Sequence, residues 1–319
     1  MRRTLLGLAV AALCAIEAHA QTFPSKSIHL IVGFPPGGGT DNLARAIAPK
    51  AGEALGQPVV VENNGGASGM LATQQVQRSA PDGYTLLLMT TGGHLLRPML
   101  EKDVPFDPIK DFTPVTQINI SVIAIAANPA TGPKSFEDLI DRARRNPGKL
   151  AYGTAGLGTE THFMIENIGH LINGPMQVVP YKGGGPALND LLGGQIPLVI
   201  QPVVTFLQHA RAGKLRILAM ILPKRWETLP EVPTVNEFIP KFQSPMGGGA
   251  VWGPAKLPQP IALRLQSAIA SAINDPAVNE RLRADGHILA ASTPAVFAAE
   301  LLRQKALFEQ LLKEVNLKQ

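Results

Sequence analysis

One glycine-rich stretch, Phe-Pro-Pro-Gly-Gly-Gly-Thr-Asp-Asn at residues 34–42, joins an apolar, β-branched run at 28–32 to a helical pattern at 41–55. A strand that turns through glycines into a helix directs several unpaired backbone N–H groups at one point. The positive end of the helix dipole lies behind that point. The stretch therefore predicts a strand-turn-helix unit with an anion-binding turn.

The same alternation of apolar runs and helical patterns continues along the chain. Several runs are apolar at consecutive positions, as expected when helices cover both faces of a parallel sheet. The predicted strands are 28–34, 58–62, 84–89, 122–127, 150–154, 177–181, 196–201, 215–221 and 249–252. The predicted helices are 41–55, 69–78, 136–145, 159–171, 186–192, 260–273, 276–284 and 294–312. The sequence predicts an α/β, doubly wound fold, with a kink rather than an early end at Pro49 in the first helix.

The length of 319 residues favours two domains. Two proline-rich segments without clear periodicity, 103–114 and 223–245, are the candidate crossings between them. Each lies beside an apolar strand candidate, so two connecting strands would form a hinge. We predict a discontinuous first lobe, residues 21–121 plus 222–319, that encloses a second lobe at 122–221.

The N-terminus has the pattern of a secretory signal peptide. Residues 1–3 are a basic start, 5–16 are apolar, and 18–20 form an Ala-His-Ala cleavage site. The apolar run is too short to span a bilayer. We predict a signal peptide at 1–20, cleavage after Ala20 and export to the periplasm. Cleavage would also remove Cys14, the only cysteine, so the mature protein would have no disulfide and no thiol nucleophile.

Composition and motif spacing exclude several functions. The net charge of +5 is scattered and aromatic residues make up 5%, which argues against nucleic-acid binding. The histidines are not at metal-ligand spacing, so we expect no metal and no cofactor. No catalytic triad or carboxylate pair is apparent, and we expect no catalytic residue. An exported hydrolase that uses Thr159 and His162 remains an alternative, although these positions are neighbours on any helix.

Glycine turns recur at several predicted strand ends. A second strand-turn-helix unit lies at 154–162, and further turns follow at 91–93 and 181–185. Turns of this kind, one per lobe, can face each other across a cleft, where α/β proteins bind ligands. Asn42 stands at the third glycine of a dinucleotide fingerprint and no Gly-Lys-Ser/Thr follows, which disfavours nucleotides. The alternative for residues 34–42 is a tight glycine turn that binds no ligand.

The ordered motifs of the chain resemble the tripartite tricarboxylate transporter substrate-binding family, often called Bug receptors. The resemblance covers essentially the whole mature chain. Its motifs are Phe-Pro-Pro-Gly-Gly-Gly-Thr-Asp at 34–41, Gly-Gln-Pro-Val-Val-Val-Glu-Asn at 56–63, Ala-Pro-Asp-Gly-Tyr-Thr-Leu at 80–86, Pro-Tyr-Lys-Gly at 180–183, Asp-Leu-Leu-Gly-Gly-Gln at 190–195, Arg-Ala-Gly-Lys-Leu-Arg at 211–216 and Leu-Pro-Glu-Val-Pro-Thr at 229–234.

The resemblance implies a periplasmic binding protein with two doubly wound α/β lobes, joined by two crossing strands around a ligand cleft. It implies capture of a small carboxylate, such as a di- or tricarboxylate or an aromatic acid. Delivery to membrane permease subunits of a tripartite tricarboxylate transporter would follow. A second role as a ligand-dependent partner of a sensor kinase remains open. We expect a monomer that is not an enzyme.

The turns and the resemblance together predict a ligand site on both lobes. In the family, backbone amides and hydroxyls of the turns at 34–41 and 154–162 hold carboxylate oxygens. The predicted ligand-binding residues are Phe34, Pro36, Gly37, Gly38, Gly39, Thr40, Asp41, Thr91, Gly92, Thr154, Gly156, Gly158, Thr159, His162 and Gln201.

Two positions depart from the family pattern. Gln201 stands where Asp or Asn is frequent, which disfavours ligands with a cationic amine. Glu160 stands where a small polar residue is common, and it would either repel an anion or cap its helix. We therefore expect a plain carboxylic acid in preference to an amino acid.

Overall fold

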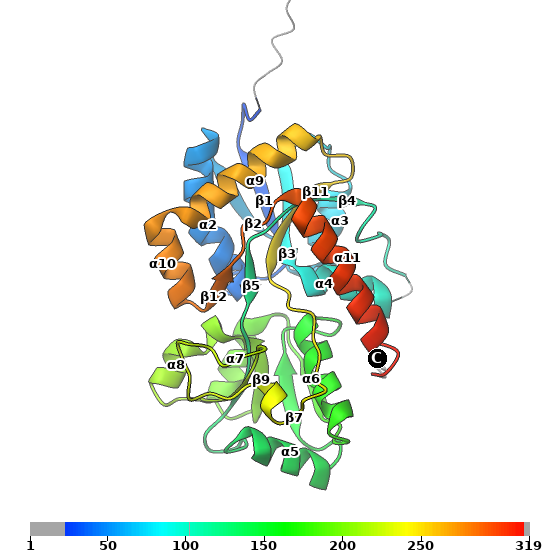
Figure 1. The fold of residues 1–319 in the computed structure, drawn as a ribbon, viewed down its shortest axis with the longest axis vertical. Helices are drawn as coiled ribbons and strands as arrows, with labels where there is room; N and C mark the ends of the chain where they lie inside the picture. The colour runs from blue at the N-terminus through cyan, green and yellow to red at the C-terminus, as the bar shows by residue number, and fades with distance from the viewer. Residues whose placement is uncertain (1–22, 102, 316–319) are drawn as a thin grey trace, which may run out of the picture.

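The computed structural model describes residues 23–101 and 103–315, and the predicted signal peptide at 1–20 lies outside this range. The described chain forms two lobes that are stacked along the long axis of the molecule (Figure 1). Each lobe is built on a five-stranded mixed sheet with helices on both faces. This is the fold of a two-lobed binding protein, as the sequence predicts.

The first sheet has the strand order β2-β1-β3-β11-β4. The strands β1, β2 and β3 are parallel, and β11 is antiparallel to both of its neighbours. Its strands are β1 (Ile28–Val32), β2 (Val59–Asn63), β3 (Thr85–Thr90), β4 (Phe112–Gln117) and β11 (Gly249–Pro254). Its helices are α2 (Gly39–Leu55), η1 (Gly66–Gly69), α3 (Met70–Gln77), α4 (Thr91–Leu100), α9 (Gln259–Asn274), α10 (Pro276–Ala284) and α11 (Pro294–Leu311).

The second sheet has the strand order β10-β6-β9-β7-β8, in which β6 is antiparallel to its neighbours and the last three strands are parallel. Its strands are β6 (Ile123–Ala127), β7 (Ala151–Thr154), β8 (Gln177–Pro180), β9 (Leu198–Pro202) and β10 (Arg216–Ile221). Its helices are α5 (Phe136–Arg145), α6 (Glu160–Leu171), α7 (Gly184–Leu192), η2 (Val203–Thr205), α8 (Leu207–Arg211) and η3 (Val235–Glu237).

Strands that are apolar at consecutive positions are covered on both faces, as the sequence predicts. In β6, Ile123 and Ile125 belong to the core beneath α5 and α6, whereas Ala124 and Ala126 belong to the core beneath α7 and α8. Successive side chains of a strand point to opposite faces, so a strand that is covered on both sides is apolar throughout. All five residues of β6 are buried.

Two segments run between the lobes side by side (Figure 1). The outgoing segment contains β5 (Asn119–Ser121), which pairs with β12 (His287–Leu289). The returning segment leads into β11, and two backbone hydrogen bonds of 2.9 Å join the segments: Ile118 N–H to Gly249 O, and Ser121 N–H to Gly247 O. In the described chain, these two crossing segments are the only covalent connections between the two sheets.

The return crossing lies later in the chain than the predicted lobe boundary. Val235, Ile239 and Phe242 pack in the core of the second sheet, although they fall in the part that was expected to belong to the first lobe. Packing therefore continues the second lobe beyond residue 221. The predicted boundary at 121/122 lies within the outgoing crossing segment.

Four elements differ from the sequence prediction. The strand β4 begins inside the segment 103–114, and β5 and β12 are too short for a periodic pattern. Thr91 starts the helix α4 directly after β3, where a turn was expected. The helix α2, in contrast, agrees with the prediction, because it continues through Pro49 to Leu55 and does not end early at the proline.

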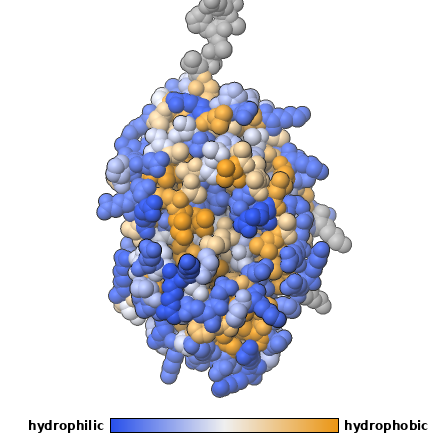
Figure 2. Space-filling model, in the orientation of Figure 1, coloured by the Kyte–Doolittle hydropathy of each residue, from blue (hydrophilic) through white to orange (hydrophobic). Residues whose placement is uncertain are grey.

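The exposed large apolar side chains come from different elements: Val60, Leu71, Leu263, Ile288, Val296 and Leu302. On one face of the molecule, groups of hydrophobic residues are separated by polar ones (Figure 2). Within residues 23–101 and 103–315, no helix is both long enough and apolar enough to cross a membrane.

Candidate functional site

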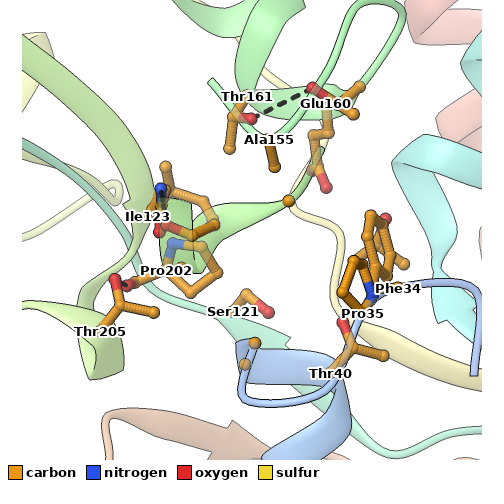
Figure 3. Close-up of a pocket in the computed structure, with 18 of the residues that line it drawn as sticks. Phe34, Pro35, Thr40, Ser121, Ile123, Ala155, Glu160, Thr161, Pro202 and Thr205 are labelled. Atoms are coloured by element: carbon orange, nitrogen blue, oxygen red, sulfur yellow. Dashed lines mark hydrogen bonds between the residues drawn. The ribbon is translucent and has the colours of Figure 1, made fainter. Parts of the chain in front are cut away.

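A cavity of about 90 Å³ lies between the two lobes. Figure 3 shows Phe34 and Thr40 on one side of it and Ile123 and Pro202 on the other. The lining residues are Phe34, Pro35, Pro36, Gly38, Gly39, Thr40, Thr90, Ser121, Ile123, Ala155, Thr159, Glu160, Thr161, Gly183, Gly184, Gly185, Pro186, Gln201, Pro202 and Thr205. A concave pocket between two domains is a place where proteins commonly bind small molecules.

The turn at 34–42 contributes its backbone to the cavity. Gly38 is the N-cap of α2 and provides no side chain to cap it, so the first N–H groups of the helix face the cavity without an internal acceptor. Gly37 adopts a left-handed conformation with φ of 83°, which glycine accepts at no steric cost. The predicted strand-turn-helix unit is therefore present in the first lobe.

Asp41 supports this turn from behind and does not line the cavity. Its carboxylate accepts hydrogen bonds from Gly37 N–H at 2.9 Å, Arg45 Nε at 3.0 Å and Asn63 Nδ2 at 2.8 Å. Burial alone would raise the pKa of Asp41, but hydrogen bonds from Arg45, Gly37 and Asn63 outweigh burial and hold the pKa below its usual value. Asp41 thus fixes the loop that places Gly38 beside the cavity.

The turn at 154–162 is tied together by hydroxyl groups. Thr159 caps α6 by accepting a hydrogen bond from His162 N–H at 3.3 Å, and its own hydroxyl donates to Gly156 O at 2.8 Å. Thr154 Oγ1 lies 2.9 Å from Thr161 Oγ1. Of the predicted residues in this turn, Thr159 lines the cavity, whereas Thr154, Gly156, Gly158 and His162 lie behind it.

His162 has no catalytic partner in the described chain. Its Nδ1 accepts a hydrogen bond from Gly158 N–H at 3.2 Å, and burial lowers its pKa to about 4. The ring is therefore neutral at physiological pH. Because the Thr159 hydroxyl donates to a backbone carbonyl instead of to His162, the pair lacks the geometry of a nucleophile and its base.

The turn at 183–185 lies in the same cavity and was not part of the predicted site. Gly183 is the N-cap of α7, again without a side-chain cap. Gln201 holds this turn, because its Nε2 donates to Gly184 O at 2.9 Å. Its Oε1 is buried without a hydrogen-bond partner. The signal for this turn was visible in the sequence as three consecutive glycines after a strand, but its position opposite Gly38 was not.

Thr91 and Gly92 are fully buried and do not line the cavity. The end of α4 where they lie is covered by the side chain of Glu160, whose Oε1 accepts a hydrogen bond from Gly247 N–H at 3.0 Å. Glu160 is the single ionisable residue among those that line the cavity, and it is 5% exposed. Burial raises its pKa to about 7, and the bond from Gly247 opposes that rise.

Other lining residues carried no sequence signal. Ser121 ends β5 in the outgoing crossing and Ile123 begins β6, whereas Pro202 ends β9 and Thr205 ends η2. They reach the cavity only because the two sheets are brought together at the hinge. Among the described residues, no group of three or more His, Cys, Asp or Glu side chains is arranged to hold a metal ion.

The fold and the cavity define a two-lobed solute-binding protein. The chain belongs to the tripartite tricarboxylate transporter receptor family, whose family model matches residues 43–311. The protein BugT of Bordetella pertussis is similar, with 36% identity over 283 residues that cover 88% of this chain and 86% of BugT. This family consists of periplasmic solute-binding proteins rather than enzymes.

Solved structures of similar proteins superpose closely on the chain. The periplasmic binding protein BugD has a TM-score of 0.87 at 31% identity, covering 93% of this chain and 99% of its own. Rpa4515 of R. palustris, solved with adipate, has a TM-score of 0.87 at 31% identity, covering 92% and 98%. MatC of Rhodopseudomonas palustris, solved with bound malate, has a TM-score of 0.85 at 29% identity, covering 91% and 100%. The relatives with ligands thus bind small carboxylates.

Proposed function

We propose that this protein is an exported periplasmic receptor that closes two lobes around a small carboxylate and delivers it to a tripartite tricarboxylate-type membrane permease. The observation that carries the proposal is the inter-lobe cavity, which two helices face with uncapped N-termini, α2 at Gly38 and α7 at Gly183. The adipate and malate complexes of relatives support a carboxylate as the ligand class.

The ligand carboxylate would be held without a cationic side chain. The described lining contains no lysine, arginine or histidine. The N–H groups at the start of α2 and α7 are the available donors, with the hydroxyl of Thr40 beside them. Backbone N–H groups at a helix N-terminus suit an anion, because they combine directed hydrogen bonds with the positive end of the dipole.

The energetics require both lobes. One helix terminus stabilises an anion by roughly 0.3–2 kcal/mol, whereas micromolar affinity needs about 8 kcal/mol. Charge-assisted hydrogen bonds contribute about 1.5–3 kcal/mol each before association costs are subtracted. Several such bonds, drawn from α2 in the first lobe and α7 in the second, are therefore needed. The ligand then stabilises the closed arrangement, with the paired crossing segments as the hinge.

Export follows from the predicted signal peptide at 1–20, with cleavage after Ala20. A closed, liganded form would be the form that the permease recognises, since only that form has both lobes fixed in one arrangement. The closed receptor would act as a monomer and would perform no chemistry on its ligand. The hydrogen bonds of Thr159 and His162 support this last point, since neither group is poised for attack.

The test is ligand-induced stabilisation of the mature protein, residues 21–319. A panel of small carboxylic acids should raise the melting temperature, and the corresponding uncharged amides should not. Mass spectrometry of the purified protein should identify a retained acid. The proposal is wrong if no acid in a broad panel raises the melting temperature while another ligand class does.

A further inference from the structure

The carboxyl group of Glu160 occupies a glycine-lined recess beside the cavity. The recess is formed by the start of α4, with Thr91 and Gly92, and by Gly247 of the returning crossing segment. Gly247 N–H donates to Oε1 at 3.0 Å. Glu160 begins α6 in the second lobe, and its side chain lies against Gly92 at the start of α4 in the first lobe.

The recess fits a carboxyl group closely. A Cβ at Gly92 would lie 2.5 Å from Glu160 Cβ and 2.7 Å from Oε2. A Cβ at Gly247 would lie 2.6 Å from both Glu160 Oε1 and Thr91 Oγ1. Neither position has room for any side chain beside Glu160. A backbone donor at Gly247 and two glycines that permit close approach together accommodate a carboxyl group, beside the start of α4, which Thr90 caps.

We propose that Glu160 fills a carboxylate subsite of the cavity from within the chain, so that the receptor selects acids with one carboxylate over dicarboxylates of the same length. This inference rests on the proposed function, because it assumes that the cavity holds a carboxylate at all. The ligand carboxylate would lie at the turns of Gly38 and Gly183, and the remainder of the ligand would extend toward Glu160.

The rest of the lining supports this ligand class. The side chains around the cavity that lack polar groups are Phe34, Pro35, Pro36, Ile123, Ala155, Pro186 and Pro202. They favour an apolar body. A second ligand carboxylate would displace Glu160 or face it without a cation between them. Where the Glu160 carboxyl group is ionised, bringing the two like charges together costs several kcal/mol. Where it is protonated, the space that it occupies still excludes a second carboxylate. Selection against dicarboxylates would therefore arise from both occupied space and repulsion.

The test compares acids that differ only in a terminal carboxylate: hexanoate with adipate, and butyrate with succinate. Affinities are measured by calorimetry on the wild-type protein and on Glu160→Ala, Glu160→Ser and Glu160→Gln. The wild-type protein should bind the monocarboxylate of each pair at least about tenfold more tightly than the dicarboxylate. A fraction of the cost of bringing two like charges together is enough to give that ratio. The alanine and serine variants should gain dicarboxylate affinity by a similar factor.

The glutamine variant is the matched control, because it keeps the shape and the Gly247 bond while it removes the charge. It should continue to exclude dicarboxylates if occupancy of the recess is the cause. The inference is overturned if wild type binds both members of each pair equally, or if the glutamine variant admits dicarboxylates as readily as alanine does. Should the alanine and serine variants fail to fold, the wild-type and glutamine comparisons decide alone. If no acid binds any form, the proposed function itself fails.

Discussion

Glu160 and Gly247 are joined by a hydrogen bond of 3.0 Å, from the backbone N–H of Gly247 to the buried carboxyl group of Glu160. The two residues are far apart in the sequence and belong to different parts of the binding protein. Glu160 starts a helix of the second lobe, and Gly247 lies in the segment that returns to the first. The bond therefore links the cavity wall directly to the hinge.

The Glu160→Gln variant should alter how stability depends on pH. Burial raises the folded-state pKa of Glu160 from 4.5 to about 7. The unfolding free energy of the wild-type protein therefore decreases as the pH rises from about 4.5 through 7. Glutamine does not titrate. The unfolding free energy of the variant relative to wild type should increase by on the order of 3 kcal/mol between pH 4 and pH 8. Chemical denaturation at several pH values measures this, and a constant difference would contradict it.

Asp41→Asn should weaken ligand binding although Asp41 does not touch the cavity. The amide cannot accept from Gly37, Arg45 and Asn63 at once, so the loop that presents Gly38 loses its support. We expect a destabilisation of about 1–3 kcal/mol and a lower affinity. Thermal unfolding and calorimetry measure the two effects.

Asp138→Asn is the matched control for this change. Asp138 accepts hydrogen bonds from Lys134 N–H and Arg142 in the same local pattern, at the start of α5 away from the cavity. Its replacement should leave ligand affinity unchanged. Equal losses of affinity in the two variants would show that the effect of Asp41 is general destabilisation.

Gly184→Ala should disturb the cavity through Gln201. A Cβ at residue 184 would lie 2.6 Å from Gln201 Oε1, so the amide or the turn must move. We expect ligand affinity to fall by about tenfold, since one misplaced hydrogen bond to an anion is worth about that much. Gly193→Ala, at the other end of α7, meets its nearest atom at 3.4 Å and should have no such effect. Unchanged affinity in Gly184→Ala would contradict a role for this turn.

The buried histidines should make the protein sensitive to acid. Burial lowers the pKa of His94 and His287 to about 4, whereas both rise to ordinary values on unfolding. The folded state therefore loses stability as the pH falls from about 6.5 toward 4. His94 lies among Phe106, Phe112 and Trp252, so His94→Phe should reduce this pH dependence. The unfolding free energy of the variant, measured across this range, should vary less than that of wild type.

Much of the fold could be predicted because its signals are local. The apolar runs that became β3 and β6 are continuous, since each strand is covered on both faces. The helices α5 and α10 have the predicted bounds, because the cap Ser135 marks the start of α5 and the cap Asp275 with Pro276 marks the start of α10. The strands β5 and β12 carried no such signal, since three residues are too few to show a period.

The sequence alone was enough to predict a sheet with helices on both faces in each lobe and glycine turns at the strand ends, because strand burial and φ preferences act over a few residues. Only the tertiary structure decided which turns meet. It placed Gly183 opposite Gly38, removed Gly37 and Asp41 from the cavity wall, and brought Glu160 into the recess of Gly92. Such contacts depend on the distance at which the hinge holds the two sheets, and no local sequence pattern encodes that distance.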